Sequence, residues 1–283
     1  MLNKNVETIF GCDAAYQDAA TVLFGAPFDS TTSFRPGARF GSRAIRQESY
    51  GLETYSPYQQ ADLADLSIFD SGDLELPFGV PDRALAMIRE RASTILADGK
   101  RPFLLGGEHL VTLGAVQAVA ERYPDLHIIH FDAHADLREE YLGATFSHAS
   151  VLRRCWDILG DGRIFQFGIR SGDRAEFSWG RGRVHTQLFD FTGLGAVLDT
   201  LRGKPVYLTV DLDVLDPSLF PGTGTPEAGG VSFTGLLQAL LLTIGQANVV
   251  ACDVNELAPT LDPSGVSTAV ACKVVREMLV ALG

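Results

Sequence analysis

The chain lacks several features that would assign it to whole classes of protein. It has only four cysteines among 283 residues, and no two of them form a CxxC pair. We therefore expect reduced thiols rather than a disulfide framework or a cysteine-rich zinc site. A basic-then-apolar N-terminal signal and an apolar run of about 18 residues are also absent, so the sequence predicts a soluble, cytoplasmic protein.

Positive charge is also scarce. The chain has 23 Lys and Arg against 35 Asp and Glu, which gives a formal net charge of −12. Binding to nucleic acid or to an anionic membrane surface requires a basic footprint, so we expect neither partner. The excess of acids is compatible with a small cationic substrate.

Linkers, internal repeats and low-complexity segments are absent as well, so we predict a single domain over residues 1–283. Hydrophobic residues make up 46% of the chain, enough for a large core. Apolar runs typical of strands lie at 21–26, 67–69, 101–105, 128–131, 163–169, 184–188, 205–210 and 248–253. Segments with helical spacing lie between most of them. This alternation predicts an α/β fold with a mostly parallel sheet between helices.

Residues able to bind metal gather where these predicted strands end. In the segment HIIHFDAHAD at 127–136, an apolar strand is followed by Asp132, His134 and Asp136 at every second position. Side chains two residues apart on extended backbone point to the same side. Open α/β sheets bind their ligands at the carboxyl ends of strands. We interpret the segment as half of a metal site, the alternative being a polar loop whose acids are solvated.

Two other strand ends supply the second half. Asp211 and Asp213 follow another apolar strand, and His109 follows the pair Gly106-Gly107. Four carboxylates and two imidazoles on three strand ends predict a site for two metal ions. A donor set rich in carboxylate favours Mn²⁺ over Zn²⁺, which prefers thiolate and imidazole.

The predicted site has a definite chemistry. Shared carboxylates would hold two ions roughly 3.5–4 Å apart and lower the pKa of a bridging water from about 15.7 towards about 7. With both ions and a hydroxide bound, the site would keep a negative charge and favour a cationic substrate over a phosphate. The glycine-rich loop 221–230 lacks the Lys-Ser/Thr pair of a phosphate-binding loop, and we expect it to form a wall of the active site.

These motifs resemble those of a known family. Gly106-Gly107-Glu108-His109, Asp132-Ala133-His134-Ala135-Asp136 and the segment from Asp211 to Pro217 are similar to the three signatures of the ureohydrolases, the arginases and agmatinases. Further similarity lies at 36–41, 70–73, 221–226 and 253–259. The resemblance covers the chain from about residue 20 to the end and looks closest to bacterial agmatinases.

The resemblance implies a three-layer α/β/α fold with two Mn²⁺ ions per chain. It implies that one ion is held by His109, Asp132, Asp136 and Asp211, and the other by Asp132, His134, Asp211 and Asp213. It also implies hydrolysis of a guanidinium group to urea and an amine, and a homo-oligomer, either a trimer or a hexamer.

Two further residues gain roles from the resemblance. His148 resembles the family's proton-shuttling histidine, and an imidazole has a suitable pKa for that role. Glu256 resembles the carboxylate that orients the guanidinium through two parallel hydrogen bonds. The alternatives are a locally satisfied histidine at a helix start and a surface acid at a strand end. The sequence departs from the common pattern at Glu108, where many members have Asp, at Ala135, and in the SHAS context of the histidine.

The loop after the metal motif bears on which guanidine is the substrate. Glu139 and Glu140 in this loop would repel a carboxylate and favour a cationic tail, so we predict a substrate contact for Glu139. Asp173 either lines the pocket or forms a salt bridge. These residues favour the hydrolysis of agmatine to putrescine and urea, a step of polyamine biosynthesis. Guanidinobutyrate, arginine and aminopropylagmatine stay open as substrates. A non-catalytic regulator or a one-ion zinc amidohydrolase of the deacetylase kind are alternatives from other classes.

Overall fold

The computed structural model describes residues 7–283, and residues 1–6 of the predicted domain lie outside the described part. Eight strands form one sheet in the order β4-β1-β5-β10-β9-β6-β7-β8, and neighbouring strands in it are parallel. The strands are β1 (Thr21–Gly25), β4 (Ile68–Asp73), β5 (Arg101–Leu105), β6 (His127–Phe131), β7 (Ile164–Ile169), β8 (His185–Leu188), β9 (Pro205–Asp211) and β10 (Asn248–Asn255). The predicted α/β fold with a parallel sheet is confirmed.

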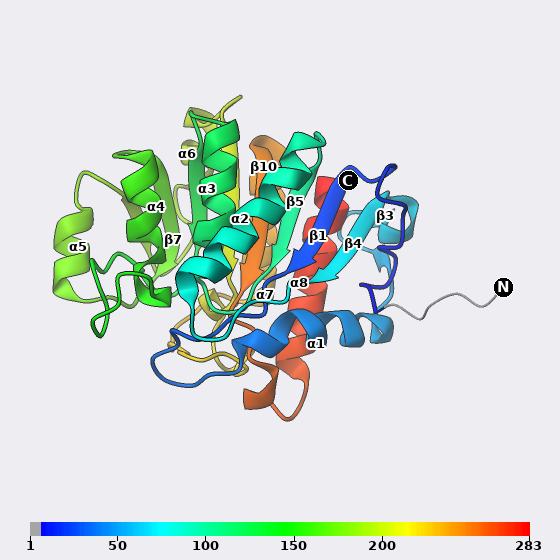
Figure 1. The fold of residues 1–283 in the computed structure, drawn as a ribbon, viewed down its shortest axis with the longest axis horizontal. Coiled ribbons are helices and arrows are strands. Elements are labelled where there is room, and N and C mark those ends of the chain that lie inside the picture. Colours follow the sequence, from blue (N-terminus) through cyan, green and yellow to red (C-terminus); the bar gives the residue numbers. More distant parts are fainter. Residues whose placement is uncertain (1–6) are drawn as a thin grey trace.

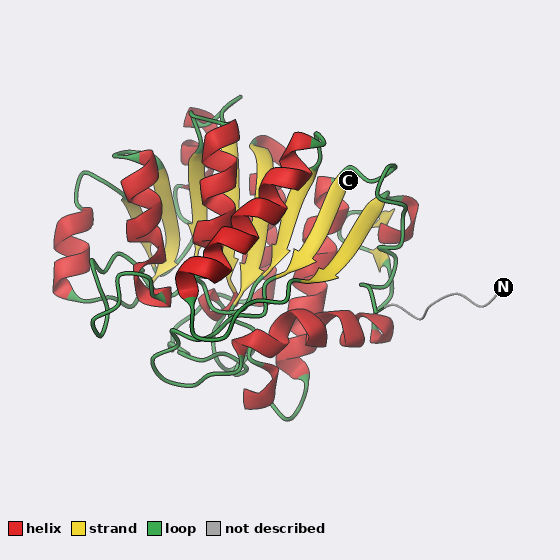
Figure 2. Ribbon diagram, in the orientation of Figure 1, coloured by secondary structure: helices red, strands yellow, loops and turns green. Residues whose placement is uncertain are grey.

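Helices cover both faces of this sheet and complete three layers (Figures 1 and 2). The helices are α1 (Gly41–Glu48), α2 (Pro81–Ala97), α3 (Val111–Arg122), α4 (Val151–Leu159), α5 (Arg174–Gly180), α6 (Leu194–Thr200), α7 (Phe233–Gln246) and α8 (Val266–Leu282). One hydrophobic cluster joins the sheet to α1, α6, α7 and α8, and a second joins its other face to α2, α3 and α4. Burial of both sheet faces explains why the strands read as continuous apolar runs.

Local sequence signals account for the start of α7 and for the buried face of α8. The Ser232 hydroxyl accepts a hydrogen bond from the Gly235 amide and so caps the start of α7. In α8, Val274 and Met278 are buried, as their spacing of four residues predicts, whereas Val266 in the first turn is exposed.

Two short features have no counterpart in the predicted pattern. The first is a two-stranded antiparallel pair formed by β2 (Tyr55–Ser56) and β3 (Ala61–Asp62). The second is helix α5, which follows β7. Each is too short to show a hydrophobic period in the sequence, so periodicity alone could not reveal it.

The sheet order explains where chemistry can occur. Strands β5, β10, β9 and β6 are consecutive neighbours, so their carboxyl ends open onto one place. Glycines permit this approach: a Cβ on Gly106 would lie 1.8 Å from Asn255 Oδ1, and one on Gly107 would lie 2.1 Å from the Phe28 carbonyl oxygen. Within residues 7–283, no helix is long and apolar enough to cross a membrane.

Candidate active site

The first group of predicted ligands converges on His109. Its Nδ1 lies 3.0 Å from Asp132 Oδ2 and 3.1 Å from Asp136 Oδ2. The same nitrogen lies 3.5 Å from Asp211 Oδ2. Nevertheless this buried nitrogen has no hydrogen-bond partner among residues 7–283. Buried polar atoms are normally hydrogen-bonded. An imidazole nitrogen left unpartnered among three carboxylates therefore fits a metal ligand.

The second group is built around His134. Its Nδ1 lies 2.9 Å from Asp213 Oδ2 and 3.5 Å from Asp132 Oδ1. Asp213 Oδ2 is a second buried atom without a hydrogen-bond partner in the part of the chain that the structure describes. Asp132, His134 and Asp213 offer atoms close enough to hold one ion. Because Asp132 belongs to both groups, the structure brings all six predicted residues together around a shared carboxylate.

Backbone strain marks two residues of this region. Asp136 and Glu256 have φ values of 53° and 66°, in the left-handed region that non-glycine residues rarely occupy. The Glu256 amide donates to the Gly107 carbonyl oxygen (2.9 Å), and its Oε1 accepts from the His109 amide (2.8 Å). Such strain persists where surrounding contacts enforce it, typically at functional sites.

The six residues carry more negative charge than the chain compensates. Within residues 7–283, their ion pairs involve histidines and no lysine or arginine. Burial and the charges of Asp213 and Asp132 raise the pKa of Asp211 well above its usual value. Burial and Asp132 also raise the pKa of Asp136 to about 7. Burial opposes protonation of His109, but the neighbouring carboxylates outweigh it and raise its pKa well above 6.5. Such a cluster is suited to bind cations.

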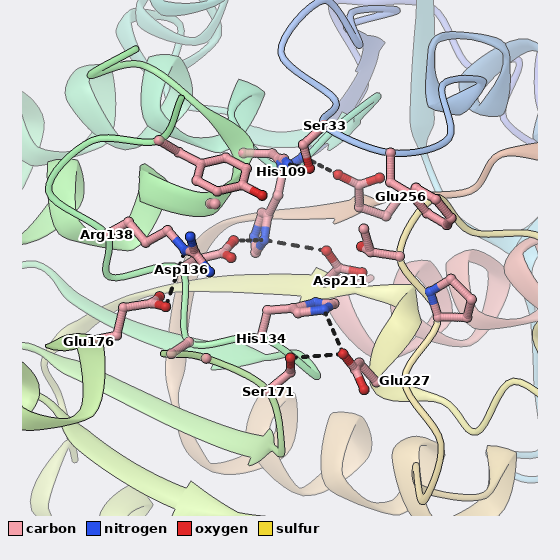
Figure 3. A pocket seen from close by; sticks show the side chains of 18 residues that line it. Ser33, His109, His134, Asp136, Arg138, Ser171, Glu176, Asp211, Glu227 and Glu256 are labelled. Carbon is pink, nitrogen blue, oxygen red and sulfur yellow. Dashed lines mark hydrogen bonds and ion pairs between the residues drawn. The ribbon is translucent and has the colours of Figure 1, made fainter. Parts of the chain in front are cut away.

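A cavity of about 390 Å³ opens beside this cluster. Its wall includes His109, His134, Asp136, Asp211, His148, Glu256 and the segment from Thr225 to Glu227. Figure 3 shows the labelled histidines and acids pointing into this space. Part of the loop 221–230, Thr225 to Glu227, thus lines the cavity, and His148 and Glu256 share it with four of the predicted metal ligands.

His148 is held by the loop that follows β1. Its amide donates to Thr31 Oγ1 (3.1 Å), and its ring Nε2 lies 3.1 Å from Ser33 Oγ. Burial, followed by the nearby charge of His134, lowers the pKa of His148 to about 4. The ring is therefore neutral at pH 7 and able to accept a proton.

Glu108, which directly precedes the predicted ligand His109, anchors the same loop. The fully buried Glu108 carboxylate accepts hydrogen bonds from the Thr31 amide and hydroxyl and from the Thr32 hydroxyl. Burial, opposed by these hydrogen bonds, raises the pKa of Glu108 to about 7. Glu108 thus supports Thr31, which in turn holds His148.

The structure does not place Asp173 and Glu139 where the sequence analysis expected them. Asp173 is exposed and caps α5: its carboxylate accepts from the Glu176 amide, and the Glu176 carboxylate accepts from the Asp173 amide, both at 2.8 Å. Glu139 and its neighbour Glu140 are exposed and lie outside the cavity wall. The reason is local, because Asp-x-x-Glu is a capping box and the loop turns its two acids to solvent.

Other charged residues occupy the wall instead. Arg138 and Glu176 both line the cavity, with Arg138 Nε 3.3 Å from Glu176 Oε2. The Arg138 guanidinium lies over the Tyr141 ring, 4.4 Å from its centroid. Sequence reasoning missed this pair. The two-residue rule does not extend from Asp136 to Arg138, because the backbone at Asp136 is left-handed rather than extended.

The opposite part of the wall carries an acid that the sequence analysis also missed. Glu227 Oε1 accepts a hydrogen bond from Ser171 Oγ (2.8 Å) and lies 3.9 Å from His134 Nε2 (Figure 3). Glu227 belongs to the loop predicted as a wall, so its place near the site followed from that prediction. Its orientation toward His134 depended on Ser171.

Comparisons with known proteins agree with this architecture. The model of the arginase family matches residues 19–281. The agmatinase of Bacillus subtilis (strain 168) is 46% identical over 267 residues, covering 93% of this chain and 92% of that protein. The N(1)-aminopropylagmatine ureohydrolase of Thermococcus kodakarensis is 38% identical over 248 residues, covering 86% of this chain and 84% of that protein. The crystal structure of agmatine ureohydrolase of Thermoplasma volcanium has a TM-score of 0.90 and 33% identity, covering 99% of this chain and 95% of that one. The chain therefore belongs to the arginase family.

Proposed function

We propose that this protein is a two-manganese hydrolase that cleaves the guanidinium group of agmatine to give putrescine and urea. The observation that carries the proposal is one cavity that joins the convergent His/Asp cluster to His148 and Glu256. Further support comes from the 46% identity to an agmatinase across nearly the whole chain.

The donor set fits two manganese ions. The proposed first ion takes His109, Asp132, Asp136 and Asp211, and the second takes Asp132, His134, Asp211 and Asp213. Support comes from His109 Nδ1 and Asp213 Oδ2, which are buried without hydrogen-bond partners among the described residues. The predominance of carboxylate favours Mn²⁺. When bound, two such ions would supply a water acidified to a pKa of about 7.

Glu256 is the proposed anchor for the guanidinium. Its Oε1 is oriented by the His109 amide, and its side chain faces the cavity. Burial, with the charge of Glu108, raises the pKa of Glu256 well above its usual value. A guanidinium is a permanent cation, so its arrival favours the ionised carboxylate and a paired hydrogen bond.

His148 is the proposed proton carrier. Its ring is neutral at pH 7 and lies on the cavity wall, with Ser33 contacting Nε2. A neutral imidazole can take a proton released during attack and deliver it to the amine that leaves. Replacement of His148 by Asn should lower urea release by about 10²- to 10⁴-fold and leave metal content unchanged.

The cavity walls favour a cationic tail. Arg138 and Glu176 offset each other's charge in the wall, which leaves Glu227, besides the proposed guanidinium anchor Glu256, as the acid beside the metal ligands. A longer cationic tail, that of aminopropylagmatine, is the second candidate, because a relative that carries this activity in its name is 38% identical. The single-domain organisation over residues 1–283, the homo-oligomeric state and the cytoplasmic location stay predictions.

The test is urea release by the Mn²⁺-loaded protein with agmatine, aminopropylagmatine, guanidinobutyrate and arginine side by side. A strong preference for agmatine is expected. Turnover of arginine as fast as that of agmatine would contradict the proposed substrate. Turnover of none of them, with about one zinc per chain by elemental analysis, would favour an amidohydrolase of the deacetylase kind.

A further inference from the structure

A row of polar side chains crosses the sheet directly beneath the predicted metal ligands. His130 on β6 pairs in register with Gln166 on β7 and with Thr209 on β9, and Gln166 pairs with Thr186 on β8. His130, Gln166 and Thr209 are fully buried. Buried polar groups in a sheet interior are costly unless they are hydrogen-bonded. The hydrogen bonds of this row therefore indicate what it does.

The orientation of the Gln166 amide can be assigned from its partners. Thr186 Oγ1 donates to Gln166 Oε1 at 3.1 Å, and Gln166 Nε2 donates to the Ala135 carbonyl oxygen at 2.7 Å. The second hydrogen of the same amide nitrogen faces His130 Nδ1 at 3.1 Å. An amide nitrogen only donates. His130 Nδ1 must therefore accept, and the hydrogen of the neutral ring lies on Nε2.

That hydrogen points to a predicted metal ligand. His130 Nε2 lies 2.7 Å from Asp132 Oδ2, while Asp132 Oδ1 accepts from the His134 amide at 2.5 Å. Both oxygens of the carboxylate shared by the two ligand groups are thus oriented by donors from the chain. Outer partners of this kind orient metal ligands and are needed for affinity.

His130 could instead be a ligand itself, since His109, His130 and Asp132 offer atoms close enough to hold an ion. A ligand requires a free lone pair on Nε2, which places the hydrogen on Nδ1. That hydrogen would then face the donating Gln166 nitrogen at 3.1 Å. The contacts on both ring nitrogens therefore favour a donor over a ligand.

We propose that His130 is a positioning residue: held by Gln166 in the tautomer with hydrogen on Nε2, it donates to Asp132 and orients this carboxylate for metal binding. The role of Asp132 as a ligand rests on the proposed function. The tautomer of His130 does not, because it follows from the contacts of His130 and Gln166 alone.

The tautomer can be tested by ¹⁵N NMR of the histidine-labelled full-length protein, without ions and with Mg²⁺ as a diamagnetic probe. The resonances of His130 are assigned by their loss in His130→Gln. We expect a neutral ring with hydrogen on Nε2 in both states. Hydrogen on Nδ1, or a Mg²⁺-induced shift that marks direct coordination through Nε2, would overturn the proposal. This readout does not depend on the substrate, so failure of the proposed agmatine activity leaves it interpretable.

Metal binding supplies the second test, with two matched variants. His130→Gln keeps a donor near the position of Nε2, and His130→Leu removes it. We expect Mn²⁺ affinity to fall by about 10- to 100-fold in His130→Leu and to be largely retained in His130→Gln, with two ions per chain at saturation in both. Loss of one ion in both variants would make His130 a ligand and overturn the proposal. Equal affinity in all three proteins would overturn it as well.

Gln166→Glu tests the partner that sets the tautomer. A carboxylate at this position accepts from Nδ1 and moves the hydrogen away from Nε2, so we expect the alternative tautomer in the spectrum and weaker Mn²⁺ binding. Thr186→Val is the control, because it removes only the hydrogen bond from Thr186 to Gln166 Oε1 and keeps the contact between Gln166 and His130. If Gln166→Glu does not fold, Gln166→Met removes the donor to Nδ1 without adding charge. An unchanged tautomer preference and affinity in the folded variant would contradict the assigned role of Gln166.

Discussion

Two clusters of acids lie near the carboxyl edge of the same sheet, and their charges are balanced differently. In the arginine-paired cluster, the buried Arg46 contacts both oxygens of Asp70, at 2.8 and 2.9 Å, and also pairs with Asp73. In the ligand cluster, formed by the six predicted metal ligands, the carboxylates lie next to histidines. Within residues 7–283, the ion pairs of these six residues include no arginine or lysine.

The two clusters differ in whether the fold itself supplies the cation that balances the acids. A buried carboxylate with its own guanidinium satisfies its charge when the chain folds. Carboxylates without such a partner raise one another's pKa values, as Asp211 and Asp136 show, until a cation from outside arrives. In these two clusters, the arginine marks the acids whose charge the fold balances by itself.

The largest expected effect is on catalysis by the ligand cluster. Asp211→Asn should lower urea release from agmatine by about 10³-fold or more, because it removes a charge shared by both proposed ions. The free energy of unfolding of the metal-free protein, measured with urea in EDTA, should stay equal or rise, since a repelled carboxylate is removed. A large loss of metal-free stability would show that Asp211 has a structural partner.

A substitution in the arginine-paired cluster should lower stability rather than catalysis. Arg46→Met leaves Asp70 and Asp73 without their cation, so we expect a loss of about 3–5 kcal/mol in the free energy of unfolding. Mn²⁺ affinity of the folded fraction should not change. Arg43→Met on the same helix is the matched control, because Arg43 is exposed and its pair with Glu7 spans 3.7 Å; it should cost at most about 1 kcal/mol. Equal losses in the two variants would remove the contrast.

The pH dependence of stability should reverse with metal. In the metal-free protein, His109 and His134 have pKa values well above 6.5: burial opposes their charging, but the carboxylates outweigh it. The folded state therefore holds more protons than the unfolded state above pH 6.5. Stability should fall as pH rises above about 6.5, by about 1.4 kcal/mol per pH unit for each proton held. Asp136, with its pKa raised to about 7, contributes in the same direction below pH 7.

With saturating Mn²⁺ the trend should be the opposite, because deprotonated ligands bind the ion. Urea unfolding at several pH values, with EDTA and with Mn²⁺, measures both slopes. Parallel slopes in the two conditions would mean that the ligand cluster does not exchange protons for ions.

The smallest expected effect concerns the acids that do not line the cavity. Asp173→Ala removes the cap of α5 and should cost about 1 kcal/mol of stability. The ratio of agmatine to arginine turnover should stay unchanged. The exposed Glu139→Ala is the control and should change stability by less than about 0.5 kcal/mol. If either variant shifts the turnover ratio, the acid that was replaced contacts the substrate tail after all.

Several features of the site could be predicted because they depend on local spacing. Asp132, His134 and Asp136 alternate after an apolar strand, and parallel strands end at one edge, so their convergence with Asp211 and His109 followed from simple geometry. The rule that side chains two residues apart share a side would also have included His130, which lies two residues before Asp132. The apolar residues around His130 concealed it, since the segment read as a buried strand.

Other features could not be predicted from spacing. Asp173 has the charge and position of a pocket residue, but a capping box uses its carboxylate locally. Arg138 reaches the cavity instead, and its partner Glu176 comes from the short helix α5, which periodicity did not reveal. Gln166 gave no signal, because its role depends on the register of β7 against β6.

The sequence by itself determined the fold class, the strand ends that carry ligands, and the family resemblance. These properties depend on periodicity and on motifs within a few residues, which the chain carries locally. Only the tertiary structure decided which acids receive an arginine, which acids reach the cavity, and how His130 is oriented. Those outcomes depend on contacts between distant segments, where burial and hydrogen-bond geometry select one partner among several that the sequence allows.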